Sequence, residues 1–214
     1  MNLQTTLNII RAAKPCADGW AKLLKSLPPH FNHDEPIAFL HILKSNTLDD
    51  AIWALRCVLP EQEKERDREA RLFACDCAER VLRIYEVKFP EDKRPRECIE
   101  MARRFVNGNA TPQELAADYA AAYDAASVAA SVAGRAAGSA ASWAATDAAW
   151  AAAGVAWAAA SVAGRAASWA AAWAAAYDAA GVAGRAAGRV AKDAENDKHK
   201  AQFIVRFCTQ EASK

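Results

Sequence analysis

The chain has 214 residues, and its 27 lysines and arginines nearly balance its 26 aspartates and glutamates, for a net charge of +1. This length allows one buried core or two small ones. The charge balance argues against a protein that binds DNA or an anionic membrane, because both need a clear basic excess. The first 20 residues lack the basic and apolar regions of a signal peptide, so we expect a soluble, cytoplasmic protein with reduced cysteines.

The first half of the chain is predicted to form short helices separated by prolines. Apolar residues recur there at helical spacing, and Thr47 precedes two aspartates that favour a helix start. No stretch alternates between apolar and polar residues as a half-buried strand would. Predicted helices span residues 3–13, 19–26, 36–44, 61–87 and 95–106, and Gly108 fits the end of the last one. Another predicted helix begins after Thr47.

The composition changes near residues 107–109, and alanine dominates from there to about residue 190. Thr111, Pro112 and Glu114 predict a helix start. The sequence Val-Ala-Gly-Arg-Ala-Ala then occurs three times. A single helix over this region would be roughly 120 Å long, and each interior glycine costs about 1 kcal/mol. We therefore expect a few closely packed antiparallel helices that turn near some of the glycines.

These patterns predict an all-α fold, a bundle of short helices followed by closely packed Ala-rich helices. Residues 1–108 are predicted to form a helical domain of mixed composition. Residues 109–214 are predicted to form an Ala-rich repetitive region that ends in a docking helix. The residues expected to dock that last helix on the core are Phe203, Ile204, Val205 and Phe207.

The sequence contains no motif of a conventional enzyme or metal site. Cys75 and Cys77 would point about 200° apart on a helix, so they cannot share a metal or form a disulfide, and we expect buried free thiols. The turn that contains His30, His33 and Asp34 lacks further ligands, so a solvated turn is favoured over a metal site. We predict no catalytic residue, no metal and no cofactor, and a protein that acts by binding.

Three stretches of the first half contain candidate polar residues: residues 50–56 read D-A-I-W-A-L-R, residues 75–82 read C-D-C-A-E-R-V-L, and residues 90–96 read P-E-D-K-R-P-R. Over about residues 47–108 they resemble the Imm-5-like family of putative immunity proteins of bacteria and phages, many with an Ala-rich helical tail. The resemblance implies an all-α protein that neutralises a partner by binding. The alternative is a polar network that ties the helices together. The candidate cluster comprises Asp49, Arg56, Asp76, Glu79, Arg94 and Arg96.

The Ala-rich region combines a few arginines with many aromatic residues. Aromatic rings stack on bases, at roughly 1–3 kcal/mol per base, and guanidinium groups bind phosphate through paired hydrogen bonds. The alternative is that the indoles fill the core and the arginines pair with Asp124, Asp147 and Asp178. The predicted ligand-binding residues are Tyr123, Arg135, Trp143, Trp150, Trp157, Arg165, Trp169, Trp173, Tyr177, Arg185 and Arg189.

The preferred hypothesis is a non-enzymatic conflict or anti-defence protein that sequesters a small anionic, nucleotide-derived immune signal. Its pocket would be lined by tryptophan, tyrosine and arginine side chains between the subunits of a homo-oligomer. Two alternatives stay open: an immunity protein that binds and neutralises a protein toxin, and a structural Ala-rich helical module that assembles with itself. None of the three needs DNA or a membrane as a partner.

Overall fold

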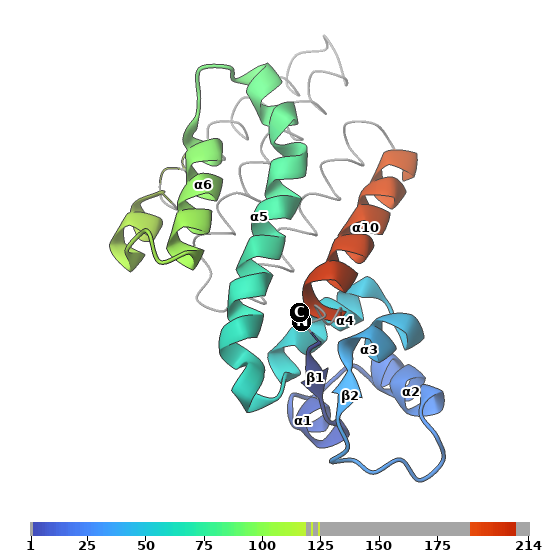
Figure 1. Cartoon of the computed structure of the whole chain (residues 1–214). Coiled ribbons are helices and arrows are strands. Elements are labelled where there is room, and N and C mark those ends of the chain that lie inside the picture. Colours follow the sequence, from blue (N-terminus) through green and yellow to red (C-terminus); the bar gives the residue numbers. More distant parts are fainter. Residues whose placement is uncertain (1, 119–120, 122–123, 125–188, 209–214) are drawn as a thin grey trace, which may run out of the picture. The chain divides into compact units, whose positions relative to one another are not determined.

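The computed structural model describes residues 2–118, 121, 124 and 189–208. In these ranges the chain is mostly helical, with one small sheet, which confirms the predicted all-α class. A further helix, without a label, covers residues 112–118. Figure 1 labels the numbered α-helices and the two strands, and the order of the elements in the described residues is β1 (Gln4–Thr5), α1 (Leu7–Ala12), α2 (Ala17–Ser26), β2 (Ile37–Ala38), α3 (Phe39–Ser45), α4 (Leu48–Ala54), η1 (Leu55–Cys57), η2 (Pro60–Gln62), α5 (Glu63–Lys88), α6 (Arg94–Val106), α10 (Arg189–Phe203) and η3 (Ile204–Cys208).

The chain divides into two compact units. The first contains Met1–Glu69 and Lys200–Lys214, so the two ends of the chain belong to one unit, and the second is Ala70–His199. The predicted boundary between residues 108 and 109 falls within the second unit. Most of the Ala-rich region lies outside the described residues, so its predicted organisation stays a prediction. Within the described part of the chain, no helix has the length and apolar composition that a membrane span requires.

The first unit contains two short strands that the sequence did not predict. β1 pairs antiparallel with β2, with Gln4 opposite Ala38 and Thr5 opposite Ile37. Each strand is two residues long, which is too short to show the alternation by which strands are recognised. The Leu3 backbone N–H donates to the Phe207 carbonyl at 2.9 Å, which joins the start of the chain to its C-terminal segment.

Side chains cap the N-termini of short helices in the first unit. The Thr47 hydroxyl accepts from the Asp50 backbone N–H at 3.1 Å, and the Asp50 carboxylate accepts from the Thr47 N–H at 3.3 Å. This reciprocal cap confirms the predicted start of α4. At α2 the Cys16 sulfur takes the same role and accepts from the Gly19 N–H at 3.3 Å.

The C-terminal segment is part of the first unit's core. Phe203 and Phe207 are fully buried, with ring centroids 4.7 Å apart. The Arg206 guanidinium donates to Glu69 at 2.7 Å. The two phenylalanines are therefore part of this core. Val205, which was also expected to dock, is 66% exposed because it points away from the side that they bury.

In the second unit, α5 lies between α6 and α10 (Figure 1). Cys75, Ala78, Leu82 and Tyr85 of α5 are buried, as its helical spacing predicts. Gly108 ends α6 with a φ of +74°, the left-handed conformation that glycine adopts without strain. The Thr111 hydroxyl and the Glu114 carboxylate then form the reciprocal cap of the helix at 112–118, as predicted.

Candidate functional site

The acidic residues of the Cys75–Leu82 motif bind an arginine of α6. Asp76 and Glu79 are one helical turn apart on α5, and both accept from the Arg103 guanidinium, at 2.8 and 2.6 Å. The hydrogen bond to Glu79, followed by that to Asp76, raises the pKa of Arg103. Arg103 was not among the predicted residues. The i, i+3 spacing of the two acids is the one signal in the sequence that they share a cationic partner.

A second ion pair joins the same two helices nearer the turn. The Arg96 guanidinium donates two hydrogen bonds to the Glu86 carboxylate, at 2.6 and 2.9 Å. These bonds lower the pKa of Glu86. The two contact points follow an antiparallel order, since the earlier residues of α5 bind the later residue of α6. We therefore assign Asp76, Glu79 and Arg96 to holding the α5–α6 hairpin together.

Asp92 organises the turn between α5 and α6. Its carboxylate accepts from Arg94 Nε at 2.8 Å, from Arg94 Nη2 at 2.6 Å and from the Arg94 backbone N–H at 3.2 Å. It also accepts from the buried Tyr85 hydroxyl at 2.6 Å. Hydrogen bonding from Arg94, assisted by Tyr85, outweighs burial and lowers the pKa of Asp92 to about 2. The motif at residues 90–96 thus encodes a fixed turn.

Replacing Asp92 with asparagine is expected to lower the free energy of unfolding by about 1–2 kcal/mol at pH 7, because hydrogen bonds to a charged group are lost. A carboxylate with a lowered pKa stabilises the fold above its unfolded pKa, near 3.8, and that contribution disappears as the pH falls through about 2. The difference between wild type and variant should therefore shrink below pH 4 in urea titrations. Glu91→Gln, at an exposed neighbour, should show no such change.

The opposite side of α5 faces α10 through a buried polar group. Arg80 Nε donates to Glu195 Oε1 at 2.6 Å, and Arg80 Nη2 lies 3.3 Å from the Cys77 sulfur. His199 is fully buried, with Nε2 3.1 Å from Glu195 Oε1, but neither ring nitrogen makes a well-directed hydrogen bond. Burial raises the pKa of Glu195, and the adjacent His199 and Arg80 more than offset it, so that the pKa is about 2.

The buried cysteines of the motif are not reactive thiols. Cys75 and Cys77 are both fully buried thiols, as predicted. They serve different sides of α5, since the Cys75 sulfur lies 3.9 Å from the Ile99 carbonyl of α6. Burial raises the pKa of Cys77 to about 12, which keeps this sulfur protonated at neutral pH. Within the described residues, no group of His, Cys, Asp and Glu is arranged to hold a metal ion.

Two of the six predicted motif residues belong to the first unit. Asp49 is exposed in the first turn of α4. The Arg56 guanidinium lies over the Trp53 ring, 4.7 Å from its centroid, and Arg56 Nε donates to the Trp53 carbonyl at 3.1 Å. Asp76, Glu79, Arg94 and Arg96 belong to the second unit. The sequence therefore marks local contacts in two units, and the structure does not group the six residues as one cluster.

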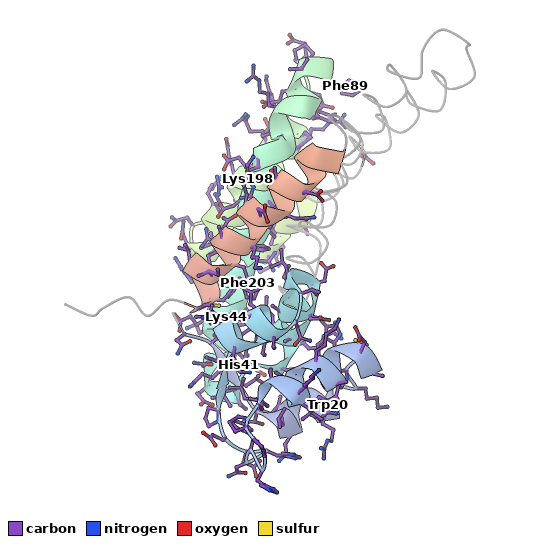
Figure 2. The ribbon with its side chains drawn as sticks, turned by 90° about the vertical axis from the view of Figure 1, so that its right-hand side faces the viewer. Trp20, His41, Lys44, Phe89, Lys198 and Phe203 are labelled. Carbon is purple, nitrogen blue, oxygen red and sulfur yellow. The ribbon has the colours of Figure 1, made fainter. Side chains whose placement is uncertain are left out.

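The α5–α6 turn also presents apolar surface beside its ion pairs. We call residues 87–93 the hairpin tip. Val87 is 76% exposed, the largest exposure among the large apolar residues of the described chain. Phe89 is half-buried, and its ring centroid lies 4.9 Å from that of Tyr85, with the two rings tilted by 36°. Figure 2 labels Phe89 at the end of α5. The exposed Glu91 and Lys93 flank this apolar surface with one charge of each sign.

The predicted ligand-binding set is not described by the structure. Only the backbone of Arg189, at the start of α10, lies inside the described ranges. The proposed stacking and phosphate-binding roles therefore remain predictions. The residues whose side chains lie outside the described part are Tyr123, Arg135, Trp143, Trp150, Trp157, Arg165, Trp169, Trp173, Tyr177, Arg185 and Arg189.

Comparison with protein families identifies one match. The family described as "Imm-5 like putative immunity protein" matches residues 60–180, more than half of the chain. The match covers α5, α6 and part of the Ala-rich region, and it begins after Asp49 and Arg56, so the motif at residues 50–56 rests on its resemblance alone. Comparisons with curated proteins and with solved structures gave no match.

Proposed function

The chain belongs to the Imm-5 like putative immunity protein family, and from this premise we propose that it neutralises a protein toxin by binding it. The family implies a non-catalytic role, in which protection comes from occupying a surface of the toxin. We further propose that the hairpin tip is part of the contact surface. The observation that carries this assignment is an exposed valine in the last turn of α5, beside a turn that Asp92 fixes through Arg94 and Tyr85.

The fixed shape of the hairpin supports this role. A binding surface gains affinity when its residues are held in place before the partner arrives, since less conformational entropy is lost on association. Asp92 holds the turn through Arg94 and Tyr85, and Arg96 holds the adjoining helix end through Glu86. The acids and arginines of the motif thus act as positioning residues for the tip.

The chemistry of the tip resembles that of protein-binding surfaces. The buried centre of such a surface is more apolar than its rim, which is polar and accessible to solvent. Val87 offers the apolar group, and Glu91 and Lys93 offer rim charges of both signs. A toxin surface with an apolar pocket and a mixed-charge rim would complement it.

The replacement Val87→Glu tests this surface. We expect it to weaken binding of the neutralised toxin by about 10–100-fold, because a carboxylate would enter an apolar pocket. Isothermal titration with a catalytically inactive toxin domain measures the affinity, and growth of cells that co-express the active toxin measures protection.

The matched control is Val205→Glu, which changes another highly exposed valine, in the first unit. It should leave both affinity and protection unchanged. Equal affinity of the Val87→Glu variant and wild type would remove the hairpin tip from the interface. Failure of the wild-type chain to protect against any toxin domain encoded beside it would count against toxin neutralisation itself.

A second candidate function rests on the repeated sequence around Arg135, Arg165 and Arg185. Arginines among small residues, with tryptophans and tyrosines nearby, suit a ligand that combines phosphates with a base. Sequestration of a nucleotide-derived signal would then accompany or replace toxin binding. Thermal unfolding with a panel of cyclic and ADP-ribose-type nucleotides tests it, and an unchanged midpoint across the panel at millimolar ligand would exclude it.

A further inference from the structure

Helix α2 has a second apolar face in addition to the one in the core. Gly19 and Leu23 are buried on its inner side. Ala17, Trp20, Ala21 and Leu24 follow the i, i+3, i+4, i+7 spacing of a continuous helical stripe. We call these four residues the α2 stripe. Figure 2 labels Trp20 on this helix.

The α2 stripe is open to solvent. Ala17 and Ala21 are exposed, Leu24 is 39% exposed, and Trp20 is half-buried. The Arg11 guanidinium lies over the Trp20 ring, 5.4 Å from its centroid, and holds the indole in position. An apolar stripe of this spacing is the pattern by which one helix recognises another.

The order of side chains along the stripe is small, large, small, large. When the helix is reversed, the order becomes large, small, large, small. Two copies of α2 packed antiparallel would therefore place Trp20 opposite the partner's Ala21 and Leu24 opposite the partner's Ala17. Each large side chain meets a small one, which is the complementarity that close helix packing requires.

Two charges of opposite sign lie on one flank of the stripe. Asp18 lies near the start of α2 and Lys25 near its end, and both are exposed. In an antiparallel pair, the same flank of each helix meets the same flank of the other, in reverse order. In this register Asp18 lies opposite residue 23 of the partner, two residues or about 3 Å along the axis from the partner's Lys25, within reach of the long lysine side chain, twice per pair. Asp18 already bonds Lys22 of its own helix at 2.6 Å, so the partner's Lys25 would share that carboxylate.

We propose that the α2 stripe is a self-association surface, through which two copies of this chain pack α2 against α2 around a two-fold axis. The surface lies outside the residues that match the family, and it is independent of the toxin-binding hairpin tip. Two ten-residue helices bury less area than the roughly 1,200–2,000 Å² of a stable interface. The dimer is therefore expected to dissociate on dilution.

Sedimentation velocity of the full-length chain over a range of concentrations tests this assignment. Wild type is expected to shift from monomer to dimer as its concentration rises into the high micromolar range. Leu24→Glu should remain monomeric, and Val205→Glu should behave like wild type. A wild-type chain that stays monomeric throughout would overturn the proposal, as would a Leu24→Glu variant that dimerises like wild type.

A charge exchange tests the antiparallel register. Lys25→Asp brings two acids close together at both ends of the pair, so it should raise the dimer dissociation constant several-fold. Adding Asp18→Lys to the same chain restores opposite charges and should return the constant toward the wild-type value. If the double variant is weaker than Lys25→Asp alone, the helices do not pair in this register.

Discussion

Replacing Glu195 with glutamine should lower the free energy of unfolding by about 3 kcal/mol, because it removes the carboxylate that Arg80 Nε binds in a largely buried site. The Glu195 side chain is 7% exposed and that of Arg80 is 24% exposed, so water compensates only in part for the lost partner. Urea unfolding followed by circular dichroism measures the change. Asp197→Asn, at an exposed acid on the same helix, should have almost no effect.

The same site offers a sharper comparison. Replacing Arg80 and Glu195 together with leucine removes both charges of the pair and should cost less than Glu195→Gln alone, which removes only one of them. A double variant that is less stable than the single one would show that the ion pair itself stabilises the α5–α10 contact. A Glu195→Gln variant as stable as wild type would contradict the buried pairing that we describe.

Truncating Phe207 to alanine is expected to cost about 3–5 kcal/mol, the range for large aromatic side chains removed from a core. Phe207 is fully buried against Phe203, and its carbonyl accepts the hydrogen bond from the Leu3 N–H. The truncation should therefore destabilise both the C-terminal segment and the start of the chain near Leu3. Hydrogen exchange at the Leu3 amide, measured together with urea unfolding, reports this coupling.

Val205→Ala provides the control for Phe207, because it removes an exposed side chain two residues away. It should change the unfolding midpoint little and leave exchange at Leu3 slow. Equal losses from the two truncations would mean that the C-terminal segment does not stabilise the first unit through its buried face.

The local features of the fold could be predicted from the sequence because neighbouring residues create them. Thr47 with Asp50, and Thr111 with Glu114, each satisfy the first backbone N–H groups of a helix from within four residues. The periodic burial along α5 follows in the same way from its apolar spacing. Gly108 ends α6 because the left-handed backbone there favours glycine.

Contacts between distant residues could not be predicted in this way. Nothing in residues 2–5 indicates that their partner is near residue 207, and a two-residue strand has no periodicity to detect. Glu195 is 115 residues away from Arg80 in the sequence. The sequence around Glu195 does not distinguish it from the exposed acids of the chain. Such pairs depend on how the helices pack, which local sequence does not specify.

The polar residues of the family motif form contacts within the protein. Asp76, Glu79, Arg94 and Arg96 are polar residues of the stretches that resemble the family, and each of them makes an ion pair within the second unit. The exposed Val87 between these residues is not part of the motif. Val87 became a candidate contact residue only because its side chain is exposed in the folded hairpin.

Recovery of the toxin after neutralisation tests the central claim most directly. A purified complex of the chain with its toxin would be separated under denaturing conditions, and the toxin would then be refolded, weighed by mass spectrometry and assayed. Protection by binding predicts a toxin of unchanged mass that regains full activity and loses it again when the chain is added in equal amount. A toxin that returns covalently altered, or stays inactive once the chain is gone, would contradict non-catalytic neutralisation.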